Sequence, residues 1–561
     1  MRRRLRSGFA TAVATCVCAA GLPLGAAGAA GAEALQTQKS GSSGKTETVR
    51  ILGIDGVAGA LEHPAGYQGT ILDGPGNAVP AGGAAYLSAS IDHLRAGSEH
   101  SVLLSTGDNL GGTTPDSALL DDRPMLESLR HMGLAASAIG ESDLVAPAAT
   151  TMSEHGFPYV ASNLAPGQDA PVTPFPFVVL DVGSTKVGVV SATDDADNPI
   201  PQRPLVGPPS TASTPWTPTK KPLEPSFRAA TDTLHSLGVD TVVGLLHMDS
   251  IHRQNDPNAC PEQFSSVPEL RDVSSSVDAL LVGGSGGPAT CDMSDPDNVR
   301  RPVLAPASHG RSVAVIDLEI DPETGRTLRD RSSTYNQRVN HDLTPDPAIE
   351  KIIADAKVEA EAVDEEPYGT TKRSISHAIE PGGESPLANL VADAEWETTS
   401  GLGADLAIYN PDSLTTDLPA GEQNYRSLRE VIPYGDRINL ADVSGERLLD
   451  AFGAYIDDVG TKGIAVSKNV SLSIDSSRPT GRKLVSASID GRPIEPGRTY
   501  TVAAGEFLLS SEWGDAPLTT LHEEPRWSGL YDVQTLADYF REHHEVDPPA
   551  TGQRLREVPK G

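Results

Sequence analysis

Short apolar runs alternate with amphipathic segments along the first 340 residues. The runs 49–55, 101–108 and 240–249 read as buried strands, whereas 84–97 and 227–238 space their apolar residues as helices do. The alternation continues through 125–133, 159–164, 277–284 and 313–321. Strands separated by helices of this length predict a largely parallel sheet with helices on its faces. In such sheets, ligands bind at the loops that follow the carboxyl ends of the strands.

The pattern changes after residue 340. A charged helical segment with few large apolar residues, 346–366, is expected to connect two domains. Beyond it, expected helices and strands in another order predict an α+β domain, with helices at 386–401 and 445–460, a strand at 404–410 and paired strands at 483–505. We therefore expect domains at 47–340 and 369–546, a connecting helix at 341–368 and a frayed tail at 547–561, rich in Pro, Glu and Arg.

The amino terminus has the pattern of a secretory signal. Four arginines within the first six residues precede an apolar run over 8–25, and small residues at 30–32 offer a cleavage site. The run is too short and too rich in alanine for a membrane span. We expect a signal peptide at 1–32, a Gly/Ser-rich linker at 33–46, and a secreted, extracellular protein without a membrane span.

Charge and length narrow the possible partners. A chain of 561 residues is too long to fold around one hydrophobic core, so we expect two or more domains. Its formal net charge of −32 becomes −36 once the four arginines of the signal are removed. Such a surface repels nucleic acid at long range, so we expect no nucleic-acid partner.

Cys260 and Cys291 are the cysteines that remain after the expected signal is removed, because Cys16 and Cys18 lie within it. In an exported protein two cysteines most simply form one disulfide. Two free buried thiols are the alternative.

Several segments together resemble one enzyme family. The second half resembles the carboxyl-terminal domain of secreted 5′-nucleotidases and UDP-sugar hydrolases, in "ESPLANLVADA", "DLAIYNP", "REVIPYGDRI" and "SGERLLDAF". The first half resembles their calcineurin-like metallophosphoesterase domain, in "VRILGIDGVAGAL", "VLLSTGDNLGG", "MLESLRHMGLAASAIGESDL" and "LLVGGSGG". The resemblance implies an α/β domain of layered sheets flanked by helices, followed by an α+β domain. It also implies hydrolysis of nucleotide phosphate esters by two divalent ions.

The first and last metal-binding motifs of that family have lost their ligands here. Gly56 and Ala58 stand where the family has Asp-x-His, and Asp55, one step earlier, is expected to point to the opposite face. The later Gly-His-Thr-His motif corresponds to the glycine-rich segment 283–287, which we call the glycine turn. Ser285 and Gly287 stand there in place of ligands.

The motifs between these two keep more of the family's ligand residues. Asp108 matches the carboxylate that bridges the two ions, and His247 matches a further ligand. In the Gly-Asn-His-Glu motif, Glu141 replaces the amide ligand and Ser142 the histidine that stabilises the transition state, while Val145 replaces the aspartate that orients it. The resemblance therefore implies at most one weakly held ion, at Asp108, Glu141 and His247. A turn-capping aspartate and a core histidine are the alternative interpretations.

The resemblance implies similar losses in the second domain. Thr415 stands where relatives have a phosphate-binding arginine. Ile464 and Pro517 replace the two aromatic rings that hold the base, while Trp513 is interpreted as packing rather than stacking. The residues that still fit the substrate-binding pattern are Asn410, Asp436 and Asp515.

We therefore expect an exported family member that has lost most or all catalysis and acts as a binding or scaffold protein, with a nucleotide-like molecule as a possible ligand. A phosphohydrolase with a reduced one-metal site is the enzyme alternative. A cell-envelope structural module is the third.

Overall fold

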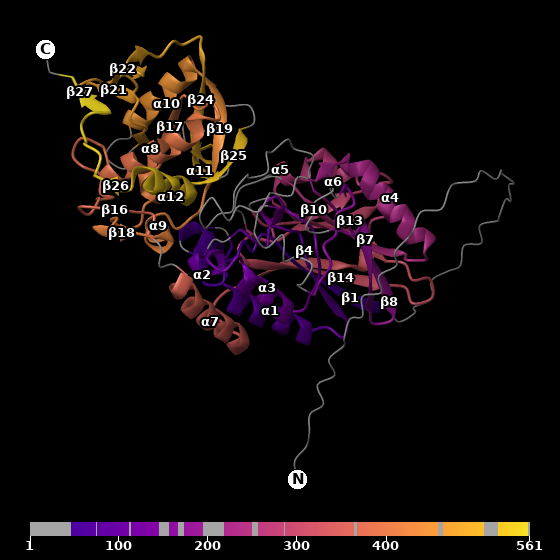
Figure 1. Cartoon of the computed structure of the whole chain (residues 1–561). Helices are drawn as coiled ribbons and strands as arrows, with labels where there is room; N and C mark the ends of the chain where they lie inside the picture. The colour runs from indigo at the N-terminus through magenta and orange to yellow at the C-terminus, as the bar shows by residue number, and fades with distance from the viewer. Residues whose placement is uncertain are drawn as a thin grey trace.

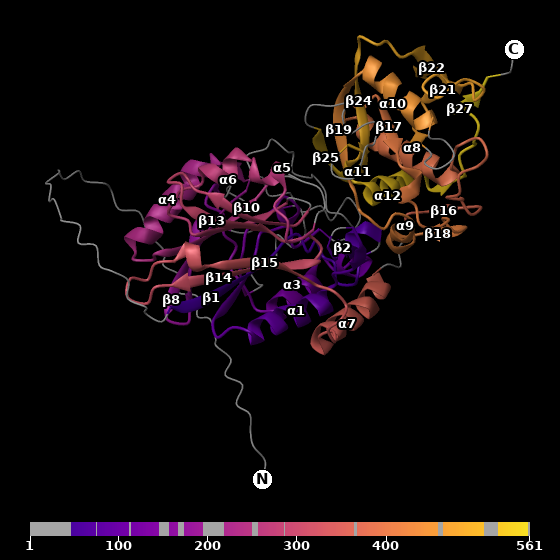
Figure 2. The same cartoon turned by 180° about the vertical axis from the view of Figure 1, so that it is seen from behind.

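The computed structural model describes residues 46–64, 66–74, 76–111, 114–144, 156–165, 173–193, 218–248, 256–284, 287–363, 367–457, 464–509 and 525–558. The expected signal peptide and nearly all of the expected linker lie outside these residues. Two domains follow one another along the chain, and one lies beside the other in both views (Figures 1 and 2). The expected fold class is confirmed.

The amino-terminal domain is built on two mixed sheets, of strand orders β15-β14-β1-β4-β5 and β12-β13-β11-β10-β8-β7. Parallel pairing joins β1, β4 and β5 in the first sheet and β8, β10, β11 and β13 in the second, while β14, β15, β12 and β7 pair antiparallel with their neighbours. The first sheet comprises β1 (Glu47–Ile54), β4 (Ser101–Ser105), β5 (Leu134–Ser137), β14 (Ser312–Ile320) and β15 (Ser333–Arg338). The second comprises β7 (Phe177–Val182), β8 (Thr185–Thr193), β10 (Thr241–His247), β11 (Ala279–Gly283), β12 (Ala289–Ser294) and β13 (Arg300–Ala305). The expected parallel arrangement is therefore correct for β1, β4 and β5 and for β8, β10, β11 and β13, and not for the other strands of the two sheets.

Helices cover the outer faces of these sheets (Figures 1 and 2). One apolar core fills the space between the sheets and includes Ile51, Leu104 and Val243. A second core lies under α1 (Ala84–Ala96) and α3 (Arg123–His131), and a third under α4 (Leu223–Ser236) and α6 (Pro268–Asp272). Such four-layer packing explains why the strands are apolar on both faces.

Smaller elements complete the domain. They are η1 (Gly66–Gly69), β2 (Thr70–Leu72), β3 (Ala78–Pro80), α2 (Pro115–Ala118), η2 (Ser142–Leu144), β6 (Leu164–Ala165), β9 (Thr219–Lys220), α5 (Glu262–Ser265) and η6 (Arg329–Arg331). The strand expected over 159–164 is reduced to isolated bridges at Tyr159 and Val160 and the two residues of β6. The connecting helix α7 (Pro347–Val363) packs against α1, α2 and α3.

The carboxyl-terminal domain centres on a sheet of order β20-β17-β24-β19-β25. Its strands are β17 (Leu406–Tyr409), β19 (Arg437–Ser444), β20 (Ala465–Val466), β24 (Thr499–Gly505) and β25 (Arg526–Tyr531). Leu406 and Ile408 join one core with α10 (Gly445–Asp457), and Tyr409 joins another with α8 (Pro386–Ser400) and α12 (Asp532–His543). Strand alternation thus places helices on both faces. The remaining elements are β16 (Gly369–Thr371), η7 (Pro411–Ser413), β18 (Gly421–Gln423), α9 (Tyr425–Val431), β21 (Val470–Ile474), β22 (Leu484–Ile489), β23 (Arg492–Pro493), α11 (Glu506–Leu509), β26 (Glu545–Val546) and β27 (Leu555–Glu557).

The expectation of a frayed tail over 547–561 is wrong for its central part. Strand β27 pairs in parallel with β21. Arg554 is buried and donates to both carboxylate oxygens of Asp393, at 2.8 and 2.7 Å. Composition suggested a solvated tail, but a buried ion pair and Leu555 anchor it.

The expected disulfide between Cys260 and Cys291 is confirmed. It ties the segment before α5 to β12. No helix of the described residues is both long and apolar enough to cross a membrane.

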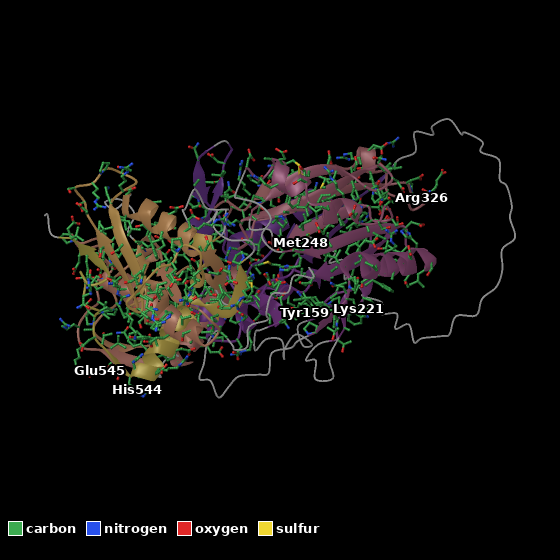
Figure 3. The ribbon with its side chains drawn as sticks, turned by 90° about the horizontal axis from the view of Figure 1, so that it is seen from above. Tyr159, Lys221, Met248, Arg326, His544 and Glu545 are labelled. Atoms are coloured by element: carbon green, nitrogen blue, oxygen red, sulfur yellow. A yellow bond between two sulfur atoms is a disulfide. The ribbon has the colours of Figure 1, made fainter. Side chains whose placement is uncertain are left out.

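The carboxyl ends of the inner strands face the second domain. Figure 3, seen from above, shows Arg326 at the far end of the first domain and His544 and Glu545 at the far end of the second, with Met248, which follows β10, between them. Contacts join the domains here: Arg426 lies 2.7 Å from the Asp116 carboxylate, and Gln68 donates to the Tyr434 carbonyl at 3.1 Å. A functional site at these strand ends would therefore have residues of both domains around it.

Candidate functional site

Three ligand-type side chains converge at the strand ends of the first domain. Asp108 lies in the turn after β4, Glu141 in the loop after β5, and His247 is the last residue of β10. One ligand atom from each lies within 4.8 Å of the others, and all three residues are buried or nearly so. The structure thus brings together the three residues that the sequence nominated for a residual metal site. We call this trio the centre.

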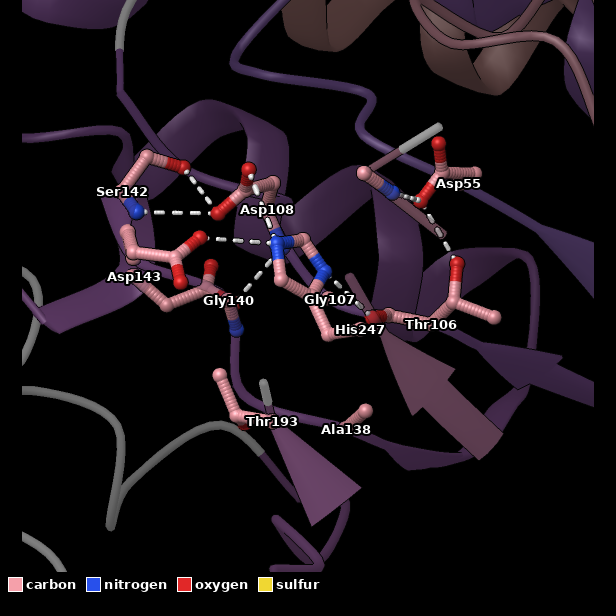
Figure 4. A network of polar contacts seen from close by, with 12 residues as sticks. Asp55, Thr106, Gly107, Asp108, Ala138, Gly140, Ser142, Asp143, Thr193 and His247 are labelled. Atoms are coloured by element: carbon pink, nitrogen blue, oxygen red, sulfur yellow. Dashed lines mark hydrogen bonds and ion pairs between the residues drawn. The ribbon is translucent and has the colours of Figure 1, made fainter. Parts of the chain in front are cut away.

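His247 is surrounded by hydrogen-bond acceptors (Figure 4). Its Nδ1 lies 2.9 Å from the carbonyl oxygen of Thr106, and its Nε2 lies 3.0 Å from Glu141 Oε2 and 3.3 Å from Asp108 Oδ2. Burial lowers the pKa of His247, but the charges of Asp108 and Glu141 more than offset burial and hold it well above the usual value. Both ring nitrogens of His247 therefore face acceptors.

Both carboxylate oxygens of Asp108 have partners. Oδ1 accepts from the backbone N–H and the hydroxyl of Ser142, at 2.9 and 2.7 Å. Oδ2 faces His247 and accepts from Arg437 of the second domain at 3.2 Å. Burial raises the pKa of Asp108, but His247 and Arg437 outweigh it and keep the pKa well below its usual range.

Asp143 holds the loops of the centre in place. Its Oδ2 accepts from the backbone N–H groups of Asp108 and Gly140, at 2.8 and 3.0 Å, and its Oδ1 from those of Asn109 and Leu110, at 2.9 and 3.2 Å. Burial and the charge of Asp108 raise its pKa to about 7, against the effect of these donors. The sequence analysis gave Asp143 no role, and these hydrogen bonds give it a structural one.

The turn after β1 carries no ligand. The N–H of Gly56 donates to the Gly107 carbonyl at 3.0 Å, and the N–H of Ala58 to the Asp108 carbonyl at 2.9 Å. Positive φ angles of 45° and 47° at Gly56 and Ala58 match the left-handed φ of 51° at Asp108. This turn therefore has a backbone conformation like that of the turn at Asp108, but it has no ligand side chain at Gly56 or Ala58.

Asp55 is not turned away from this edge of the sheets, as strand alternation had suggested. Strand β1 ends at Ile54, so alternation does not extend to Asp55. Its Oδ1 accepts from the Thr106 hydroxyl at 2.6 Å and from the Gly284 N–H at 3.2 Å. Burial raises the pKa of Asp55 to about 6. Asp55 supports the neighbouring turns but is not one of the three converging ligands.

The glycine turn after β11 comes close to His247. A Cβ on Gly284, whose φ is +70°, would lie 2.0 Å from the Met248 carbonyl oxygen, so only glycine fits there. Gly287 offers no ligand atom, and Ser285 and Val145 lie outside the described residues.

The centre fits one divalent ion. Ligand atoms at about 2.0–2.2 Å from one metal lie about 3 to 3.5 Å apart, as the 3.0 and 3.3 Å separations here do. Binding would require His247 to lose the proton on Nε2. Among the described residues, no second group of three such side chains lies together.

The second domain gives its nominated residues other partners. The Asn410 side chain accepts from the Asp412 N–H at 3.1 Å and caps η7. The Asp436 carbonyl accepts from the Asp532 N–H at 3.0 Å. Thr415 donates its hydroxyl to the Glu430 carbonyl at 2.6 Å, and Ile464 is buried in an apolar core. Asp515, Pro517 and Trp513 lie outside the described residues.

Arg437 is a side chain at the centre that the sequence analysis did not anticipate. It opens β19 and follows Asp436 in the segment "REVIPYGDRI". Its guanidinium carbon lies 4.7 Å from the centroid of the Trp527 ring. The local sequence held a signal, a basic residue in a family-like segment, but the contact to Asp108 spans 329 positions.

Comparisons with known proteins agree with this architecture. Residues 363–519 match the family model for the 5′-nucleotidase C-terminal domain. The chain is 21% identical over 516 residues to endonuclease YhcR of Bacillus subtilis, covering 89% of this chain and 40% of that protein. It is 23% identical to the cell wall protein Lmo0130 of Listeria monocytogenes, covering 91% and 69%, and 20% identical to protein UshA of Yersinia enterocolitica, covering 82% and 86%.

Solved structures share the fold across both domains. The NAD nucleotidase of Haemophilus influenzae has a TM-score of 0.65 at 14% identity, covering 92% of this chain and all of that one. The 5′-nucleotidase precursor of Thermus thermophilus has a TM-score of 0.53 at 19% identity, with the same coverage.

Proposed function

Because the chain belongs to the 5′-nucleotidase family, we propose that it keeps the two-domain scaffold of that family, has lost two-metal hydrolysis, and acts as an exported binding or scaffold protein. The observation that supports this most is the small number of ligand side chains at the centre. Among the described residues, Asp108, Glu141 and His247 are the one group that could hold an ion, and Asp108 is also in contact with Arg437.

Hydrolysis of a phosphate ester by this chemistry needs ions that polarise the phosphoryl oxygens and generate hydroxide. The turn after β1 offers the backbone of Gly56 and the methyl group of Ala58, neither of which is a ligand. Three donors suffice for one ion, and a preorganised pair needs more. The chain therefore lacks most of the positive charge on which this catalysis depends.

The groups around the centre add little to compensate. The Ser142 hydroxyl donates to Asp108 and is not free to face a leaving group. Thr415 is engaged with a backbone carbonyl. Loss of one electrostatic contact to a transition state costs about 3 kcal/mol, so several losses leave at most trace turnover.

One observation favours a second function. Asp108, Glu141 and His247 hold the geometry of a single-ion site, and one ion would polarise a phosphoryl oxygen and lower the pKa of bound water. In that alternative Arg437 pairs with the phosphate. The alternative is a one-metal phosphohydrolase.

The proposal also covers export of the protein and the chemical class of its ligand. The basic and apolar leader and the disulfide support export. Likeness to a cell wall protein supports a location at the cell envelope, where a purely structural role is a third candidate. A nucleotide-like molecule is the first ligand to test, because the family scaffold is kept.

A hydrolysis assay tests the proposal. AMP, ATP and a UDP-sugar are incubated with the full-length protein and saturating Mn²⁺, with Asp108→Ala as the matched control. We expect wild type and control to release phosphate at the same rate. A metal-dependent turnover of about 1 s⁻¹ or more, abolished in Asp108→Ala, would establish the one-metal enzyme instead. Equilibrium dialysis with AMP in the same samples measures binding separately from turnover.

A further inference from the structure

We propose that Arg437 is an interdomain latch, which holds the second domain against Asp108 and competes with a divalent cation for the same carboxylate oxygen. The inference concerns docking and cation binding, so it does not rest on the proposed loss of hydrolysis.

The position of Arg437 carries the proposal. It is the first residue of β19 and pairs with Tyr531 of β25. Its guanidinium lies over Trp527, whose ring N–H donates to the Leu530 carbonyl at 3.1 Å and whose ring meets Tyr531 edge-on at 5.5 Å. A fixed aromatic shelf beneath the guanidinium reduces the conformational freedom lost when Arg437 reaches across.

The contact falls on the oxygen that a metal would use. Oδ1 of Asp108 is taken by Ser142, whereas Oδ2 is shared by His247 and Arg437. An ion bound by Oδ2 and His247 would bring two positive charges next to the guanidinium. In a site whose groups are largely buried, such repulsion is weakly screened. Cation binding and the Arg437 contact therefore disfavour each other.

Reciprocity follows from this competition. If docking through Arg437 weakens cation binding, then cation binding weakens docking by the same factor. The ion pair between Arg426 and Asp116 and the bond from Gln68 to Tyr434 remain when Arg437 is released. We expect the domains to loosen at the centre without coming apart.

Arg498 supplies a matched control. Its guanidinium carbon also lies 4.7 Å from an aromatic centroid, that of Tyr500, and it pairs with Asp405 at 3.4 Å. These partners all lie within the second domain. Arg498→Gln therefore removes the same charge from the same kind of contact and leaves the centre unchanged.

The test combines calorimetric titration with Mn²⁺ and small-angle X-ray scattering on the full chain. Arg437→Gln should bind Mn²⁺ at least about 5-fold more tightly than wild type, in the usual range of coupling between sites, and Arg498→Gln within twofold of it. Saturating Mn²⁺ should increase the radius of gyration of wild type. Arg437→Gln should start at the larger value and not change.

Equal Mn²⁺ affinities of wild type and Arg437→Gln would overturn the latch. So would a wild-type radius of gyration that does not respond to saturating Mn²⁺, a measurement that needs no variant to fold. Failure of both forms to bind Mn²⁺ at millimolar concentration would overturn the competition as well. Hydrolysis by the wild type would contradict the proposed loss of catalysis and leave these two measurements unaffected.

Discussion

The turns after β1 and β4 lie side by side and have similar backbone conformations, but they differ in their side chains. Gly56 and Ala58 of the first turn donate to the carbonyls of Gly107 and Asp108 in the second, and both turns use left-handed residues. The second has a carboxylate with four polar contacts at Asp108, while the first has no ligand side chain at Gly56 or Ala58. The two turns thus share a backbone shape although only the second has a ligand side chain at these positions.

The difference also indicates why Asp108 remains. Its carboxylate joins Ser142, His247 and Arg437, so it stabilises the loops and the domain contact even without an ion. Removing one partner from a buried ion pair leaves a charge uncompensated and costs several kcal/mol. Gly56 and Ala58 contribute backbone hydrogen bonds, which do not depend on the identity of their side chains.

The retained turn depends most on Asp143. Asp143→Ala leaves four backbone N–H groups without their acceptor, so we expect the free energy of unfolding to fall by about 4 kcal/mol. Asp143→Asn should have a smaller effect, because its amide oxygen still accepts. Urea unfolding followed by circular dichroism measures both.

Asp412→Ala is the control for this prediction, since Asp412 is exposed. It should change stability by less than about 0.5 kcal/mol. Equal stability of Asp143→Ala and Asp412→Ala would show that the retained turn needs no carboxylate beneath it.

The turn after β11 has a covalent support close by. Cys260 and Cys291 close a loop across a sequence separation of 31. Replacing both with Ala should lower the free energy of unfolding by about 3 to 4 kcal/mol, through the greater entropy of the unfolded chain. Thermal unfolding of the double variant and of reduced wild type should agree, and an unchanged melting temperature in both would contradict the estimate.

Restoring ligands to the turn after β1 sharpens the comparison. Asp, Asn and His tolerate the left-handed backbone that Gly56 and Ala58 adopt. A Cβ at position 56 would lie 3.3 Å from the Cβ of Ser308, which requires a small shift. Gly56→Asp with Ala58→His should raise Mn²⁺ affinity about 10-fold or more, an effect of about 1.4 kcal/mol. Gly56→Asn with Ala58→His, which lacks the added carboxylate, should gain less in the same titration.

Much of the fold was predictable from the sequence, because apolar periodicity reports directly on burial. Strand β10 and helix α1 lie within the segments expected for them. Antiparallel edge strands such as β7 and β12 were not foreseen, since pairing direction is set by tertiary connections and leaves no local pattern. The tail was misjudged because the buried partner of Arg554, Asp393, lies 161 residues away.

The centre was predictable where its residues follow strand ends and not where a contact joins the two domains. Asp108, Glu141 and His247 each follow a strand whose carboxyl end meets the others, so their convergence follows from topology. The side chain of Asp55 was misplaced by assuming that the strand continued. Arg437 escaped notice because its role exists only when the two domains dock.

The number of ions that the protein holds tests the central claim most directly. The full chain is equilibrated with excess Mn²⁺, desalted rapidly and analysed for metal and protein. With no ligands at Gly56 and Ala58 and Arg437 already in contact with Asp108, we expect fewer than one ion per chain. Two retained ions per chain would contradict the proposed loss of two-metal binding, because a second ion needs ligands beyond Asp108, Glu141 and His247.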